Sequence, residues 1–196
     1  MEEVEYRGGK VLRREGAPVA ENLIYFDLET QRGADEVGGW ENKHRMLFAF
    51  GVTYSTRDRL FHGYEEEDVP ALVRDLQVAD RVIGYNLLNF DYAVLSAYTS
   101  FDFSKLPTLD LLADVSSLLG FRPRLDMLAA ATLNSRKSAD GLTSLRWFRE
   151  GQFAKIALYC KEDVRITRDL HWFGRERGHI FYLDRQGAKK ELKVSW

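Results

Sequence analysis

The sequence has little of what marks several protein classes. It contains a single cysteine, four prolines and no strong excess of either charge, with 28 basic and 30 acidic side chains in 196 residues. One cysteine cannot form an internal disulfide, which is typical of a reducing compartment, and we expect a cytoplasmic protein. No apolar run approaches the roughly 18 residues of a membrane helix, and no basic-then-apolar stretch follows Met1. We therefore expect no membrane association and no secretory signal.

What is present is typical of a single globular domain. Hydrophobic residues make up 45% of the chain and charged residues 30%, which excludes collagen-like, coiled-coil and disordered classes. We find no internal repeat and no linker rich in proline or serine. The sequence predicts an N-terminal arm over residues 1–20 with a short strand near Val11-Leu12, one domain over 21–178, and a C-terminal hairpin over 179–196 packed on that domain.

Hydrophobic periodicity predicts a mixed α/β domain around one central sheet flanked by helices. Residues 31–43 are rich in glycine and charge and predict a loop, while 108–115 fit either a strand or the start of a helix. The predicted strands cover residues 23–29, 46–54, 59–64 and 81–85, with the closing hairpin at 179–194. The predicted helices cover residues 65–78, 92–98, 125–133, 142–148 and 153–173, with a break over 175–178.

The first candidate motif is the pair Asp27 and Glu29 on the predicted strand 23–29. Residues i and i+2 of a strand point to one face, so both carboxylates project together. Two carboxylates so close resist joint ionisation unless a cation lies between them, and oxygen ligands suit Mg²⁺ or Mn²⁺. The alternative is an edge strand with a solvated polar face.

The second candidate motif covers residues 84–91, with the sequence GYNLLNFD. It follows a predicted buried strand and opens a predicted helix, which places Asp91 at a helix N-terminus at the end of the sheet. The alternative is a structural role, in which Asn89 or Asp91 caps the helix, because both residue types are common caps.

The third candidate motif covers residues 159–163, with the sequence YCKED. Tyr159 and Asp163 stand four apart in the longest predicted helix, so the phenol and the carboxylate lie one turn apart on one face. The alternative is an amphipathic tyrosine beside an exposed aspartate. Cys160 has no histidine near it in the sequence, which favours a buried structural thiol over a nucleophile.

Together and in this order, the three motifs resemble those of the DEDD superfamily of 3′–5′ exonucleases, which share a ribonuclease-H-like fold. The resemblance spans roughly residues 22–175. Residues 84–91 are especially similar to the proofreading domains of family B DNA polymerases, and the overall layout is similar to stand-alone bacterial exonucleases. Tyr159 matches the tyrosine subclass, because the histidine subclass would place its histidine where Leu158 stands.

The resemblance implies hydrolysis of phosphodiester bonds by two divalent ions, Mg²⁺ or Mn²⁺. It implies that Asp27 bridges both ions, that Glu29 and Asp163 complete one site, and that Asp91 holds the other ion largely through waters. It also implies that Tyr159 orients the attacking water. The expected substrates are single-stranded or frayed 3′ ends of DNA or RNA.

Contacts to substrate are expected from a second set of residues. Asn86 and Asn89 could bind sugar or phosphate, although capping explains them equally well, and Phe90 could stack on a base, although core packing is the commoner role. Thr30 completes the first motif and joins this set. A basic stretch could line the path of the phosphate backbone, with a solvated surface as the alternative. Its members are Arg122, Arg124, Arg136, Lys137, Arg146 and Arg149.

The distribution of charge is uneven along the chain. Residues 1–100 carry 11 basic and 18 acidic side chains, and the remaining residues carry 17 and 12, so charges of −7 and +5 sum to −2. The pattern fits solvated faces, or an acidic metal-holding half opposite a basic half that contacts a polyanion. Besides the enzyme, the sequence fits a catalytically silent ribonuclease-H-like module that binds nucleic acid or a protein. A polymerase or helicase partner on another chain is a further expectation.

Overall fold

The computed structural model describes residues 21–135, 141–184 and 186–196, with the side chains of 141 and 142 left aside. The predicted arm over 1–20, with its strand near Val11-Leu12, lies outside the described residues. Arg136 and Lys137 of the predicted basic stretch also lie outside them.

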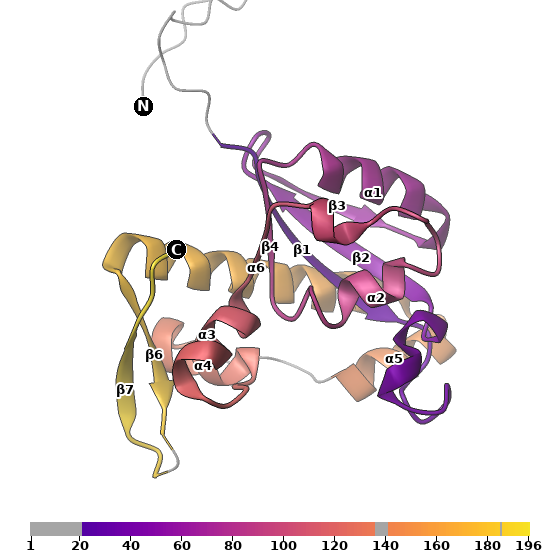
Figure 1. The fold of residues 1–196 in the computed structure, drawn as a ribbon. Coiled ribbons are helices and arrows are strands. Elements are labelled where there is room, and N and C mark those ends of the chain that lie inside the picture. The colour runs from indigo at the N-terminus through magenta and orange to yellow at the C-terminus, as the bar shows by residue number, and fades with distance from the viewer. Residues whose placement is uncertain (1–20, 136–140, 185) are drawn as a thin grey trace, which may run out of the picture.

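A five-stranded mixed sheet forms the centre of the molecule, in the order β3-β2-β1-β4-β5 (Figure 1). β1 (Leu23–Thr30) pairs antiparallel with β2 (Phe48–Ser55) and parallel with β4 (Arg81–Gly84). β3 (Leu60–Tyr64) pairs antiparallel with β2, and β5 (Thr108–Asp110) pairs parallel with β4. The predicted mixed α/β architecture with one central sheet is therefore confirmed.

β1 lies in the middle of this sheet, with β2 on one side and β4 on the other. The edge-strand alternative for Asp27 and Glu29 is therefore wrong. Tyr25, on the same face of β1 as these two acids, is completely buried, so this face is covered by another layer of the protein. A strand that is covered on both faces belongs in the centre of a sheet rather than at its solvated edge.

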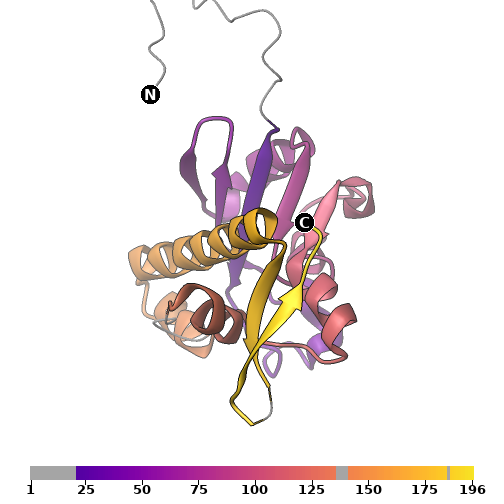
Figure 2. The ribbon, with the colours of Figure 1, turned by 90° about the vertical axis from the view of Figure 1, so that its left-hand side faces the viewer.

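Helices cover both faces of the sheet. α1 (Val69–Gln77) and α2 (Asp91–Leu95) pack on the face that carries Ile24, Phe26 and Leu28. The long helix α6 (Phe153–Arg177) crosses the opposite face, as Figures 1 and 2 show. Three more helices lie on that side: α3 (Leu111–Leu119), α4 (Leu125–Leu133) and α5 (Gly141–Arg149). Short 3₁₀ turns form η1 (Trp40–Arg45), η2 (Glu66–Asp68) and η3 (Phe103–Lys105).

Several predicted boundaries shift in ways that local chemistry explains. The ambiguous stretch 108–115 is first a strand and then a helix. Asp110 ends β5, and its carboxylate caps α3 by accepting hydrogen bonds from the backbone N–H groups of Leu112 and Ala113. The break predicted over 175–178 is placed too early. α6 continues through the helix-favouring Arg175 and ends at Arg177, where Gly178 adopts a left-handed conformation with φ of 71°.

The C-terminal residues form the predicted hairpin as a separate two-stranded sheet. β6 (His179–Leu183) pairs antiparallel with β7 (Lys189–Lys193). Ile180 of β6 is fully buried in the same core cluster as α4 and α6, so the hairpin packs on the helical side of the sheet. In the described part of the chain, no helix is both long and apolar enough to cross a membrane.

Candidate metal centre

Strand β1 provides the first two acidic groups of the site. Asp27 and Glu29 are half-buried and point to the α6 face, while Leu28 between them is buried on the other face. β1 pairs with β4 only as far as Tyr25, which lies opposite Ile83. The two strands therefore separate beyond this point, and the carboxylates project where the sheet opens.

Helix α6 provides the third acidic group. Asp163 and Tyr159 are both buried and lie one helical turn apart, as their spacing predicts. The alternative of an exposed aspartate is therefore wrong. The ring of Tyr159 packs edge-on against Trp147 of α5, with 6.1 Å between ring centroids. This contact fixes the ring of the tyrosine between two helices.

Asp27, Glu29 and Asp163 come together although they are distant in the sequence. Each offers one carboxylate oxygen, and these oxygens lie within 4.8 Å of one another. We call these three residues the acidic centre. Like charges at this spacing disfavour joint ionisation unless a cation offsets them, and a ligand set made only of oxygens suits Mg²⁺ or Mn²⁺. The donor set of the acidic centre therefore fits a hard divalent cation.

Asp91 lies beside the acidic centre without joining the group of three. It begins α2 and is 2% exposed, and its Oδ1 accepts a hydrogen bond of 3.2 Å from the backbone N–H of Leu28. That N–H is available because β1 and β4 have separated by this point. Burial raises the pKa of Asp91, and the nearby carboxylates of Asp110 and Glu29 add to the effect.

The capping alternative for the second motif is wrong. The N-cap of α2 is Phe90, and no side chain caps this helix end. Asn89 is exposed, and its Oδ1 lies 3.4 Å from Lys43 Nζ. The carboxylate of Asp91 turns instead to the backbone of β1. Among the other predicted substrate contacts, Thr30 is buried and donates to the carbonyl of Arg32 over 3.0 Å, which is a local structural role.

Phe90 is only partly buried. It packs against the core cluster below α2, and its ring centroid lies 6.3 Å from that of the exposed Trp40. The ring therefore contacts both the core and η1. Packing, the commoner role, accounts for most of its surroundings.

Asp110 is a structural residue near the acidic centre that the motifs alone do not indicate. Its Oδ1 accepts hydrogen bonds from the backbone N–H groups of Asn86, Leu112 and Ala113, and its Oδ2 accepts one from Leu88. One buried carboxylate thus caps α3 and also sets the shape of the segment that leads to Asp91. An aspartate between an apolar strand and a helical run, as in 108–112, is the sequence signal that could have identified it.

Cys160 lies directly behind the acidic centre. It is fully buried, and its thiol donates to the carbonyl oxygen of Asp27 at 3.2 Å and lies 3.6 Å from the Oδ2 of the same residue. Burial, together with the negative charge of Asp27, raises the pKa of this thiol. The cysteine therefore stays protonated and supports the backbone of β1, as the prediction of a structural thiol requires.

A cleft of about 400 Å³ opens beside the acidic centre. Asp27 and Asp163 line it together with the segment between α3 and α4. Asn86 lines the cleft with a left-handed backbone, φ of 80°, and its Oδ1 accepts a hydrogen bond of 2.7 Å from Arg122. The remaining lining residues are Tyr85, Leu112, Pro123, Arg124, Leu125 and Asp126. The cleft has the size of a small-ligand site.

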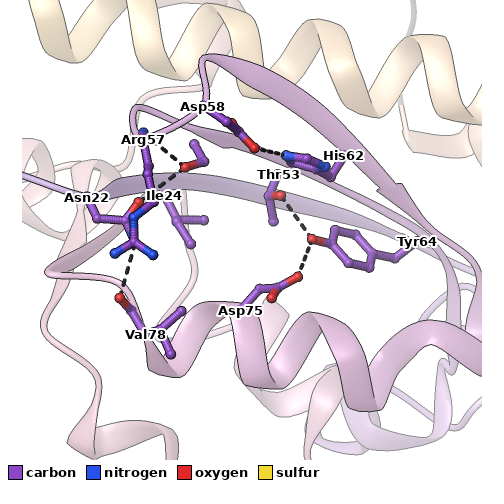
Figure 3. A pocket seen from close by; sticks show the side chains of 10 residues that line it. Asn22, Ile24, Thr53, Arg57, Asp58, His62, Tyr64, Asp75 and Val78 are labelled. Atoms are coloured by element: carbon purple, nitrogen blue, oxygen red, sulfur yellow. Dashed lines mark hydrogen bonds and ion pairs between the residues drawn. The ribbon is translucent and has the colours of Figure 1, made fainter. Parts of the chain in front are cut away.

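A second pocket, of about 190 Å³, lies on the α1 face and has a different character (Figure 3). Tyr64 donates to Asp75 at 2.8 Å and lies 3.3 Å from the hydroxyl of Thr53. His62 and Asp58 contact each other at 2.8 Å across the turn between β2 and β3. We call this set the polar pocket. Its polar groups bond to one another, which favours a structural role.

Comparison with models of known protein families gave no match, and comparison with curated protein sequences gave no significant similarity.

Proposed function

We propose that this chain is a metal-dependent 3′–5′ exonuclease of the tyrosine subclass, with a ribonuclease-H-like fold. The observation that carries the proposal is the meeting of Asp27, Glu29 and Asp163 within 4.8 Å, beside a cleft that Asp27 and Asp163 line. A five-stranded mixed sheet flanked by helices is compatible with that fold. The order of the three sequence motifs supports the same assignment.

The acidic centre would hold Mg²⁺ or Mn²⁺, with Asp91 as a further carboxylate beside it. Bound divalent ions supply activation of water and stabilisation of the leaving oxygen in phosphodiester hydrolysis. Two contacts that fix the position of Asp91 support this role, namely its bond to Leu28 and the shape that Asp110 gives to residues 86–88. The carboxylates are thus held by a strand, a helix start and a long helix, which is a rigid setting.

Tyr159 would orient the attacking water through its hydroxyl. It lies one turn from Asp163 on the buried face of α6, and its ring is held by Trp147. A side chain with a fixed ring loses little entropy when its hydroxyl binds a water, so it can align that water for attack.

The decisive test is cleavage of 5′-labelled single-stranded DNA and RNA with Mg²⁺ or Mn²⁺, and with chelator. The proposal predicts a ladder that shortens from the 3′ end, requires the metal, and is absent for Asp27→Ala. Comparison of the DNA and RNA ladders gives the sugar preference. A requirement for a polymerase or helicase on another chain stays a prediction.

Glu162→Gln is the matched control. Glu162 is the neighbour of Asp163 on α6, but its carboxylate bonds to Arg165 at 2.6 and 2.8 Å and lies outside the acidic centre. This variant should cleave like the wild type, whereas Asp163→Asn should not. Binding of the labelled strands without cleavage under either metal would instead support the catalytically silent module.

A further inference from the structure

The segment between α3 and α4 is held rigidly against the cleft. Gly120 ends α3 with a left-handed φ of 73°, and the chain then turns along the cleft. The hydroxyl of Tyr85 donates to the carbonyl of Pro123 at 2.7 Å, and Arg122 donates to Asn86 at 2.7 Å. Two adjacent residues that follow β4 thus anchor the segment at two points, which preorganises it for binding.

The two arginines of this segment differ in how their charges are neutralised. Arg124 forms a bidentate contact with Asp126, with distances of 3.2 and 3.0 Å, so an acid offsets its charge. Arg122 donates to the neutral amide oxygen of Asn86, a contact that leaves its positive charge in place. Both side chains are exposed and both line the cleft. Arg122 is therefore the one whose charge is available to an anion in the cleft.

An aromatic surface continues from Arg122 toward the C-terminal hairpin. Phe121 is 41% exposed, and its ring centroid lies 6.3 Å from that of Tyr182 on β6. Lys190 of β7 lies opposite Tyr182 in the register of the hairpin, but its Nζ pairs with Asp184 at 3.8 Å, so an acid offsets its charge. The available cation of Arg122 and the exposed ring of Phe121 thus lie next to each other beside the cleft. Single-stranded nucleic acid is bound by this combination of positive charge and stacking surfaces.

We propose that Arg122 binds a backbone phosphate of a single-stranded nucleic acid next to the bond cleaved at the acidic centre, and that Phe121 stacks on a base of the same strand. The inference rests on the proposed function, since it assigns the direction in which the substrate leaves the acidic centre. A planar guanidinium matches the oxygens of a phosphate in a bidentate contact, which a lysine does not reproduce. The substrate is accordingly a strand of several nucleotides, bound from Asp27 and Asp163 toward the hairpin.

The experiment compares the wild type, Arg122→Ala and Arg124→Ala on two substrates with Mn²⁺. One is a labelled ten-residue oligothymidylate, and the other is the p-nitrophenyl ester of thymidine monophosphate, which has no further phosphates. Loss of one charged contact to phosphate should raise the oligonucleotide KM of Arg122→Ala about tenfold, with kcat changed much less. The loss on the ester should be several times smaller. Arg124→Ala is the matched control and should stay within about twofold of the wild type on both substrates, since Asp126 already offsets its charge.

Equilibrium binding of the same oligonucleotide in chelator, followed by fluorescence anisotropy, separates the two proposals. Arg122→Ala should weaken binding about tenfold. The negative slope of log affinity against log salt concentration should become less steep by about 0.7. Phe121→Leu keeps an apolar side chain but removes the stacking face, and should weaken binding about fivefold without changing the salt slope.

If the wild type cleaves both substrates but Arg122→Ala and Arg124→Ala behave alike, the strand path is wrong while the exonuclease stands. If the wild type cleaves neither substrate, the exonuclease is wrong, and the anisotropy decides the strand path. The strand path is overturned if the wild type does not bind the oligonucleotide, or if Arg122→Ala and Arg124→Ala bind it with equal affinity.

Discussion

Each face of the central sheet carries a cluster of polar side chains, and the two clusters differ in charge. On the α6 face, Asp27, Glu29 and Asp163 gather carboxylates of like charge. On the α1 face, the hydroxyl of Tyr64 connects Thr53 to Asp75 in a hydrogen-bonded chain. Gathered like charges raise the free energy of the protein without a cation, whereas bonded polar groups stabilise it. This difference supports the proposed ligand role for the first cluster and a structural role for the second.

The largest expected effect follows from neutralising the acidic centre. Asp27→Asn should lower kcat by at least about 10²-fold, the loss typical of removing one electrostatic stabiliser of a transition state. The labelled single-strand assay with Mn²⁺ measures it. Retained activity would contradict the distinction between the two faces, since the acids would then be no more functional than those of the polar pocket.

A melting curve in chelator serves as the control for that variant. Asp27→Asn removes one of three neighbouring like charges, so its melting temperature should be no lower than that of the wild type. A lower value would mean that the lost activity reflects a damaged fold.

The next effect concerns a buried base on the α6 face. His171 is 3% exposed, and its Nδ1 lies 2.8 Å from the hydroxyl of Tyr25. Burial lowers its pKa to about 4, and the charges of Arg175 and Arg81 act in the same direction. The unfolded chain therefore binds the proton of His171 more tightly than the folded protein does. Protonation of this group accordingly does not reduce the free energy of unfolding above pH 6.5, and reduces it progressively as the pH falls toward 4.

The loss from this group should be on the order of 3 kcal/mol between pH 6.5 and 4. Urea unfolding across that range in chelator measures it. His171→Asn keeps a hydrogen-bond acceptor near the hydroxyl of Tyr25 but cannot titrate, so its stability should fall less over the same range. If the free energy of unfolding fell equally with pH for the wild type and His171→Asn, His171 would not be held neutral in the folded protein.

A smaller effect separates catalysis from metal binding. Tyr159→Phe keeps the ring against Trp147 and removes only the hydroxyl, so kcat should fall about tenfold, the value of one orienting hydrogen bond. Affinity for Mn²⁺, measured by calorimetry, should stay as in the wild type because the three carboxylates are unchanged. A variant as fast as the wild type would remove Tyr159 from the mechanism.

The smallest effect tests the other face. Burial raises the pKa of Tyr64 to about 12, so the hydroxyl keeps its proton and donates to Asp75. Tyr64→Phe leaves the buried hydroxyl of Thr53 without this partner and should cost about 1 kcal/mol, which lowers the melting temperature by about 2–4 °C. Nuclease activity should not change. A loss of activity at normal stability would show that the polar pocket acts on the acidic centre.

The alternation of residues 23–29 was enough to predict a strand with one apolar face and two carboxylates on the other. The spacing of Tyr159 and Asp163 likewise placed them on one face of a helix. Both predictions depend on periods of 2 and 3.6 residues, which are local properties of the backbone. The stretch 108–115 was ambiguous because its strand is short and its aspartate serves both as strand end and as helix cap.

Other features depended on contacts between distant segments. β1 is central rather than at an edge because α6 covers Tyr25, and Asp110 shapes residues 86–88 across a parallel strand pair. The difference between Arg122 and Arg124 arises only from their neighbours, Asn86 and Asp126. Sequence alone thus determined the faces of the elements and the order of the motifs. The tertiary structure decided which carboxylates meet and which charges remain available, because those distances depend on how strands pair and helices cross.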